Sequence, residues 1–150
     1  MVIRRHAPSP PSITTQRSSI RMTAKMRKVE IKTDKAPKMP FSLPQGVRAG
    51  DLVFVNVAPI DINGAEIDDD FERAARQIFE NAKAVLEAGG SSMANIVRID
   101  AYIRDYGNIE MFNRIYLEYV PEPYPVRSIS QPARTPRDYM CAMVVTATVD

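Results

Sequence analysis

The feature that most constrains the fold is an amphipathic helix followed closely by an alternating strand. Residues 68–70 are three aspartates, and apolar side chains then recur at helical spacing from Phe71 to Leu86, before Gly89-Gly90. This pattern predicts a helix with acids at its positive end and a glycine stop. Residues 96–104 alternate apolar and polar side chains, as in a strand with one buried and one wet face. The chain therefore has to layer helix on sheet.

The acidic cluster at 68–70 also has to be weighed as a metal site. Its spacing does not fit a calcium-binding loop, so we expect these aspartates to cap the helix and offset its dipole, and we expect no metal.

The remaining apolar runs, and the turn residues between them, predict further strands at 29–33, 51–57, 126–131 and 139–149, and a second helix over 109–120. Residues 46–50 read as a turn into the second strand, and Asn63-Gly64 marks another turn. The order strand, strand, helix, strand, helix, strand, strand predicts an α+β fold with two helices on one face of a sheet. Because no third helix covers the other face, we expect several copies to pack their sheets into a shared, barrel-like core.

The composition of the chain excludes several kinds of functional site. Cys141 is the single cysteine and His6 the single histidine, so no internal disulfide, cysteine-rich metal site or histidine-based triad is expected. No glycine-rich phosphate loop is present. No apolar run approaches the ~20 residues that cross a bilayer, so we expect no membrane association.

Charge is distributed unevenly along the chain. Residues 1–29 carry seven arginines and lysines and no acid, whereas the remaining 13 basic and 18 acidic residues give the body a formal charge of −5. An acidic body with scattered arginines is a poor surface for gripping nucleic acid, so we expect no nucleic-acid partner.

The first 28 residues are expected to lie outside the folded domain, which we assign to residues 29–150. They mix arginine with serine, threonine and proline, show no apolar period, and contain Met22 and Met26. Two interpretations stay open. The segment is an organellar presequence, or the translation start is assigned upstream of the true one at Met22 or Met26. The first would place the protein in the mitochondrial matrix and the second in the cytoplasm.

Several stretches together resemble a known family. They are Ala-Val-Leu-Glu-Ala-Gly-Gly at 84–90, Ile-Val-Arg-Ile-Asp-Ala-Tyr-Ile-Arg-Asp at 96–105, Asn113 with Tyr116, and Pro-Val-Arg-Ser at 125–128. On these motifs the chain resembles the reactive intermediate deaminase (RidA, YjgF-type) family. The resemblance implies a chorismate-mutase-like fold and a homotrimer with three clefts between subunits. It also implies hydrolysis of enamines and imines, such as 2-aminoacrylate, to a 2-keto acid and ammonia, with no cofactor.

The resemblance assigns a role to Arg127, which otherwise stands as an unexplained charge within a strand. Its planar guanidinium would hold a substrate carboxylate bidentately. An ion pair across a subunit interface is the alternative. Asn113 matches the family's helix asparagine and is the second catalytic candidate, although a solvated or helix-capping role is equally open. Ile129, beside Arg127, is expected to contact substrate.

The chain departs from the best-known members at the expected site. Phe41 stands where they have a tyrosine, and Asn56-Val57 replaces a Ser-Gly pair. Ala142 stands where the family glutamate orients the attacking water. We expect Phe41, Asn56, Val57 and Ala142 to line the substrate cleft and to make it less polar. By alternation, Cys141 should be a small core residue and not a nucleophile.

Three functions follow as hypotheses. The first is an imine or enamine deaminase of altered specificity or weak activity. The second is a non-catalytic trimer that binds a small carboxylate such as a 2-keto acid. The third, endoribonuclease, is less favoured because the body is acidic and lacks histidine outside the tail.

Overall fold

The structure, a computed structural model, describes residues 27–150. The hypotheses about the N-terminal segment concern residues that lie almost wholly outside this range. In the described part, neither helix is both long enough and apolar enough to cross a bilayer.

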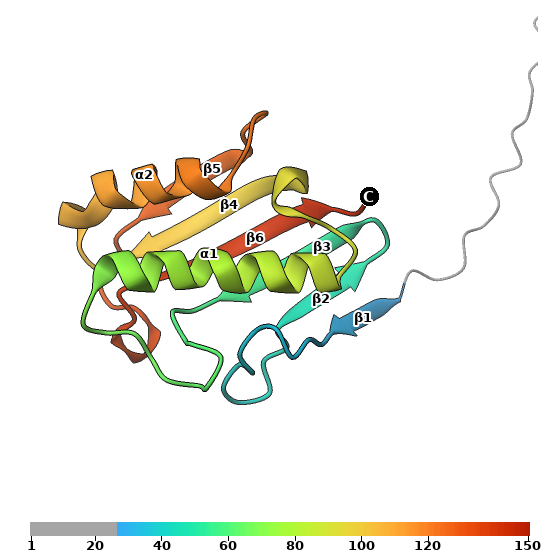
Figure 1. Cartoon of the computed structure of the whole chain (residues 1–150), viewed down its shortest axis with the longest axis horizontal. Coiled ribbons are helices and arrows are strands. Elements are labelled where there is room, and N and C mark those ends of the chain that lie inside the picture. Colours follow the sequence, from blue (N-terminus) through green and yellow to red (C-terminus); the bar gives the residue numbers. More distant parts are fainter. Residues whose placement is uncertain (1–26) are drawn as a thin grey trace, which may run out of the picture.

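One six-stranded sheet carries two α-helices on a single face (Figure 1). The strands are β1 (Lys28–Ile31), β2 (Gly46–Ala49), β3 (Leu52–Val57), β4 (Ile96–Ile103), β5 (Val126–Ser130) and β6 (Cys141–Thr148). The helices are α1 (Phe71–Ala88) and α2 (Ile109–Tyr119), with 3₁₀ turns at Met93–Asn95, Tyr106–Asn108 and Pro136–Asp138. The predicted α+β class and the one-sided helix layer are therefore confirmed.

The strands lie side by side in the order β1-β2-β3-β6-β4-β5. All neighbours are antiparallel except β4 and β5, which are parallel. A parallel pair needs a crossover, and α2 provides it between these two strands. Consequently β1 and β5 form opposite edges of the sheet, and α2 lies over the β5 edge (Figure 1).

Helix α1 begins as its sequence predicts. Asp70 is the N-cap, and its carboxylate accepts a hydrogen bond from the backbone N–H of Arg73 at 3.0 Å. The inner side of α1 buries apolar residues against the sheet: Phe71, Ala74, Ala75, Ile78, Phe79, Ala82, Val85 and Leu86. The helix ends at Gly89, and Gly90 takes a positive φ of 83°. The capping interpretation of the aspartates is confirmed for Asp70.

The prediction that residues 46–50 form only a turn is wrong, because Gly46–Ala49 is strand β2. It pairs with both β1 and β3. A Cβ at Gly46 would lie 2.7 Å from Val85 Cγ1, so this glycine lets the strand approach α1 closely. The missed strand is four residues long and carries Arg48, so it shows little apolar alternation.

The face opposite the helices is uncovered within one chain. Leu52 and Phe54 of β3, Tyr102 of β4 and Val144 of β6 present exposed apolar surface there. Their strand neighbours Val53, Val55, Ile103 and Val145 point the other way and are buried. An uncovered apolar face is what the sequence predicted.

Candidate functional site

Arg127 lies on the edge strand β5, on the face that the helices cover. It is in register with Ile99 of β4, which is fully buried beneath that layer. Because β5 is the last strand, the Arg127 side chain is exposed at the sheet edge. Its guanidinium carbon lies 4.5 Å from the centroid of the Tyr116 ring, on α2.

Within the described part of the chain, no acid neutralises Arg127. Among residues 27–150, no carboxylate lies within 4.0 Å of its guanidinium. By contrast, Arg98 pairs with Asp100 at 2.8 Å on the opposite face. The cation is therefore available to an anion supplied from outside the chain.

Asn113 lies three residues before Tyr116, so the two share one side of α2. Its Oδ1 atom is buried and has no hydrogen-bond partner within the described residues. The helix N-cap is Asn108, so Asn113 does not cap the helix. A buried, unpaired amide oxygen on the same side of α2 as Tyr116 is an acceptor that lacks its donor.

The other predicted site residues divide between the two sides of the sheet. Ile129 shares the helix-covered face with Arg127 and packs against the core. Ala142 pairs with Tyr102, and Asn56 pairs with Val144, so both face the uncovered side. Val57 is only 3% exposed and points into the core, so its side chain lines no surface of this chain.

Phe41 lies in the loop between β1 and β2, at the far edge of the sheet from Arg127. It is 90% exposed and has a left-handed backbone with φ of 60°, which is uncommon outside glycine. A single chain thus holds two separate groups. One comprises Arg127, Asn113, Tyr116 and Ile129; the other comprises Phe41, Asn56 and Ala142. We call these the arginine half-site and the loop half-site.

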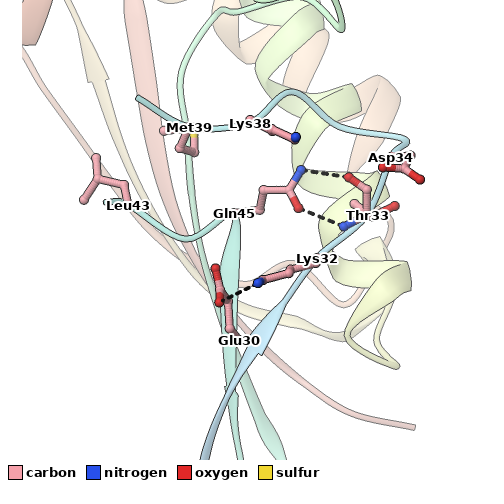
Figure 2. Close-up of a pocket in the computed structure, with 8 residues that line it drawn as sticks. All are labelled: Glu30, Lys32, Thr33, Asp34, Lys38, Met39, Leu43 and Gln45. Atoms are coloured by element: carbon pink, nitrogen blue, oxygen red, sulfur yellow. Dashed lines mark hydrogen bonds and ion pairs between the residues drawn. The ribbon is translucent and has the colours of Figure 1, made fainter. Parts of the chain in front are cut away.

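A cavity of about 450 Å³ lies at the loop end of the molecule. Figure 2 shows its lining residues: Glu30, Lys32, Thr33, Asp34, Lys38, Met39, Leu43 and Gln45. The buried Gln45 amide fixes this loop: its Oε1 accepts from the Thr33 N–H at 2.8 Å, and its Nε2 donates to the carbonyls of Thr33, Ala36 and Pro37. A hollow of about 210 Å³ adjoins it and includes Asn56 and Val144. Arg127 lines neither space.

Cys141 is fully buried on the helix-covered face, as the alternation predicted. Burial raises the pKa of its thiol to about 12, so the thiolate is not available near neutral pH. Within residues 27–150, no three His, Cys, Asp or Glu side chains gather in a way that could hold a metal ion.

The sequence model of the family described as endoribonuclease L-PSP matches residues 27–149. The chain belongs to this family. A RutC family protein of Pyrococcus abyssi is 33% identical over 124 residues, which cover 81% of this chain and 98% of that protein. Reactive intermediate deaminase A of Arabidopsis thaliana, a chloroplastic protein, is 29% identical over 132 residues, covering 85% and 67%.

TdcF of Escherichia coli gives both a sequence and a structural comparison. It is 34% identical over 117 residues, which cover 75% of this chain and 90% of TdcF. The crystal structure of TdcF with bound serine matches with a TM-score of 0.74 and covers 81% of this chain and 99% of that one. The resemblance to the RidA family is thereby confirmed. Deamination of reactive intermediates is the activity supported at the level of the family.

The contact between Tyr116 and Arg127 could not be predicted from the sequence. The contact depends on how α2 lies over β5, and no local pattern encodes that packing. The Asn113 and Tyr116 spacing, with an arginine on the next strand, is the only signal that could have suggested it.

Proposed function

We propose that this protein hydrolyses reactive 2-imino and 2-enamino acids to 2-keto acids and ammonia, with Arg127 holding the substrate carboxylate. The observation that carries the proposal is the Arg127 guanidinium, which is oriented on a ring at the sheet edge and has no carboxylate partner within the described chain. Bidentate pairing with a carboxylate is the interaction for which a guanidinium is best shaped.

The reaction asks for little chemical machinery. In its imine form the substrate has an electrophilic carbon; water adds to it, the C–N bond then breaks, and ammonia leaves with the protons that the water supplied. Holding the carboxylate and one water in place lowers the barrier by orientation. Asn113 Oδ1, on the side of α2 that carries Tyr116, has no hydrogen-bond partner among the described residues and could orient either the water or the imine N–H.

The cleft is proposed to form between copies of the chain. Phe41 lies beyond the edge of the sheet opposite Arg127, and Asn56 lies on the opposite face from Arg127, so one chain does not bring these residues together. A homotrimer that joins the loop half-site of one copy to the arginine half-site of the next would do so. The uncovered apolar face, with Phe54 and Val144, supports such packing.

Altered specificity or weak activity is expected, because Ala142 lacks the carboxyl group that the family uses to orient water. Phe41 and Tyr124, both exposed aromatic residues, favour apolar substrates over 2-aminoacrylate. The serine bound to TdcF supports small amino-acid-like ligands for the cleft.

The direct test is a coupled assay in which an amino-acid oxidase generates imines in the presence of semicarbazide. The full chain should speed imine loss, so that less semicarbazone forms, and Arg127→Ala should abolish the effect. Imines with small, aliphatic and aromatic side chains are compared to establish preference. Retention of full activity by Arg127→Ala would contradict the role given to Arg127.

Ala142 favours one alternative, a trimer that binds a 2-keto acid without catalysis. Titration calorimetry with pyruvate and larger 2-keto acids separates the two functions. Binding that depends on Arg127, with no imine hydrolysis, would support the alternative. An RNA-cleavage assay on the same preparation tests the less favoured endoribonuclease activity.

A further inference from the structure

The Arg127 guanidinium contacts an aromatic ring, whereas many structural arginines pair with a carboxylate. Its carbon lies 4.5 Å from the Tyr116 ring centroid. A carboxylate partner would occupy the guanidinium N–H donors, which all lie in the plane of the group. An aromatic ring attracts the cation through its π electrons and leaves those donors free for another partner.

The Tyr116 ring is itself held in place. It is 7% exposed, on the inner side of α2. The Phe79 ring lies on one side at 6.5 Å between centroids, and the Tyr124 ring lies at 6.2 Å. Tyr116 therefore offers Arg127 a surface of fixed position.

The ring remains uncharged under physiological conditions. Burial raises the pKa of the Tyr116 hydroxyl, and this outweighs the lowering caused by Arg127. A neutral phenol attracts the cation through its π face without supplying an anion that would compete with a substrate carboxylate.

We propose that Tyr116 is a positioning residue, whose ring holds the Arg127 guanidinium at the cleft with its N–H donors directed to substrate. Its kinetic consequence rests on the proposed function, because Tyr116 acts only through Arg127. Since the same carboxylate contact exists in the ground state and the transition state, losing the ring should raise KM and leave kcat nearly unchanged.

The kinetic test compares Tyr116→Phe, which keeps the ring, with Tyr116→Leu, which removes it. We expect the Tyr116→Phe variant to behave as wild type and the Tyr116→Leu variant to raise KM about five- to thirtyfold. Tyr119→Leu is the matched control, because Tyr119 stacks on Phe79 at 5.1 Å but lies outside the Arg127 contact. Thermal unfolding checks each variant first, and Tyr116→Met replaces the leucine variant if that one is unfolded.

A spectroscopic test does not depend on activity. The Nε–H resonance of Arg127, assigned by its absence in Arg127→Lys, should show an upfield ring-current shift in wild type and Tyr116→Phe and lose it in Tyr116→Leu. An unshifted resonance in wild type, or wild-type KM in Tyr116→Leu, would overturn the inference. A shifted resonance in a protein that neither hydrolyses imines nor binds 2-keto acids would overturn the proposed function alone.

Discussion

The side chains of Arg127 and Ala142 lie on opposite faces of the sheet, on strands that β4 separates. Arg127 is in register with the buried Ile99, whereas Ala142 is in register with the exposed Tyr102. Ala142 is instead close to Asn56, across the β3–β6 pairing. In the proposed trimer, a glutamate at position 142 would serve the loop half-site, and the arginine would come from another copy.

This arrangement predicts complementation between inactive subunits. Arg127→Ala disables the arginine half-site and Asn56→Ala weakens the loop half-site. If the two variants are unfolded together and refolded as mixed trimers, roughly a quarter of the clefts should receive two intact halves. We expect activity to rise toward that fraction of wild type, measured with the semicarbazide assay.

Mixing the variants without refolding is the control, because subunits then do not exchange. Mixed trimers no more active than either parent would contradict a cleft shared between copies. An Asn56→Ala protein with full activity would remove Asn56 from the site.

Restoring the acid should strengthen catalysis. Ala142 is half-buried on the uncovered face, so a glutamate there can keep its carboxylate in contact with water. General acid–base groups typically contribute 10²–10⁴-fold, so Ala142→Glu should raise kcat by roughly tenfold or more. Ala142→Gln is the matched control for shape without ionisation. Equal rates for the two variants would show that no acid–base group is missing.

Gly46 should be intolerant of a side chain. A Cβ there would lie 2.7 Å from Val85 Cγ1 and 3.1 Å from the Phe54 carbonyl oxygen. Overpacking of this kind costs about 1–3 kcal/mol, so Gly46→Ala should lower the urea midpoint by a corresponding amount. Val85→Ala is expected to relieve part of the strain, making the double variant more stable than the sum of the single losses predicts. Strict additivity would show that Val85 is not the obstruction.

Cys141 predicts a pH dependence of stability. Its thiol pKa is raised by burial from 9.0 to about 12, so the unfolded chain loses this proton at lower pH than the folded one. Between these two pKa values, raising the pH therefore stabilises the unfolded state relative to the folded state. The free energy of unfolding falls by about 1.4 kcal/mol per pH unit in this range. Urea unfolding at pH 8 to 10 should show a steeper decline for wild type than for Cys141→Ala. Equal slopes, or rapid reaction of the native protein with a thiol reagent at pH 8, would contradict the burial of this group.

Residues 29–150 are proposed to be the functional domain, and the family match to residues 27–149 supports this. A chain that starts at Met26 should keep the imine-hydrolysis rate and thermal midpoint of the full protein. Loss of activity with an unchanged midpoint would assign a functional role to the N-terminal segment.

Local patterns predicted the elements that have strong periodicity and capping. Phe71–Ala88 and Ile96–Ile103 follow the spacing of their apolar side chains, and Asp70 caps as expected. Gly46–Ala49 was missed because its glycine serves close packing and not a turn. The two half-sites could not be separated from sequence, because the alternation within a strand does not tell which strands are neighbours. Strand order, which decides which residues share an edge, is a property of the whole sheet.

Gln45 separates the outer part of the loop between β1 and β2 from the pairing of those two strands. The buried Gln45 amide binds backbone groups of Thr33, Ala36 and Pro37, and so ties the two ends of the loop together. Residues beyond that anchor, including the exposed Phe41, have no share in the register of β1 with β2. Insertions or substitutions at the tip can therefore accumulate while the sheet keeps its form. If the loop half-site forms part of the cleft as proposed, this tip is where the substrate preference can change without altering the sheet.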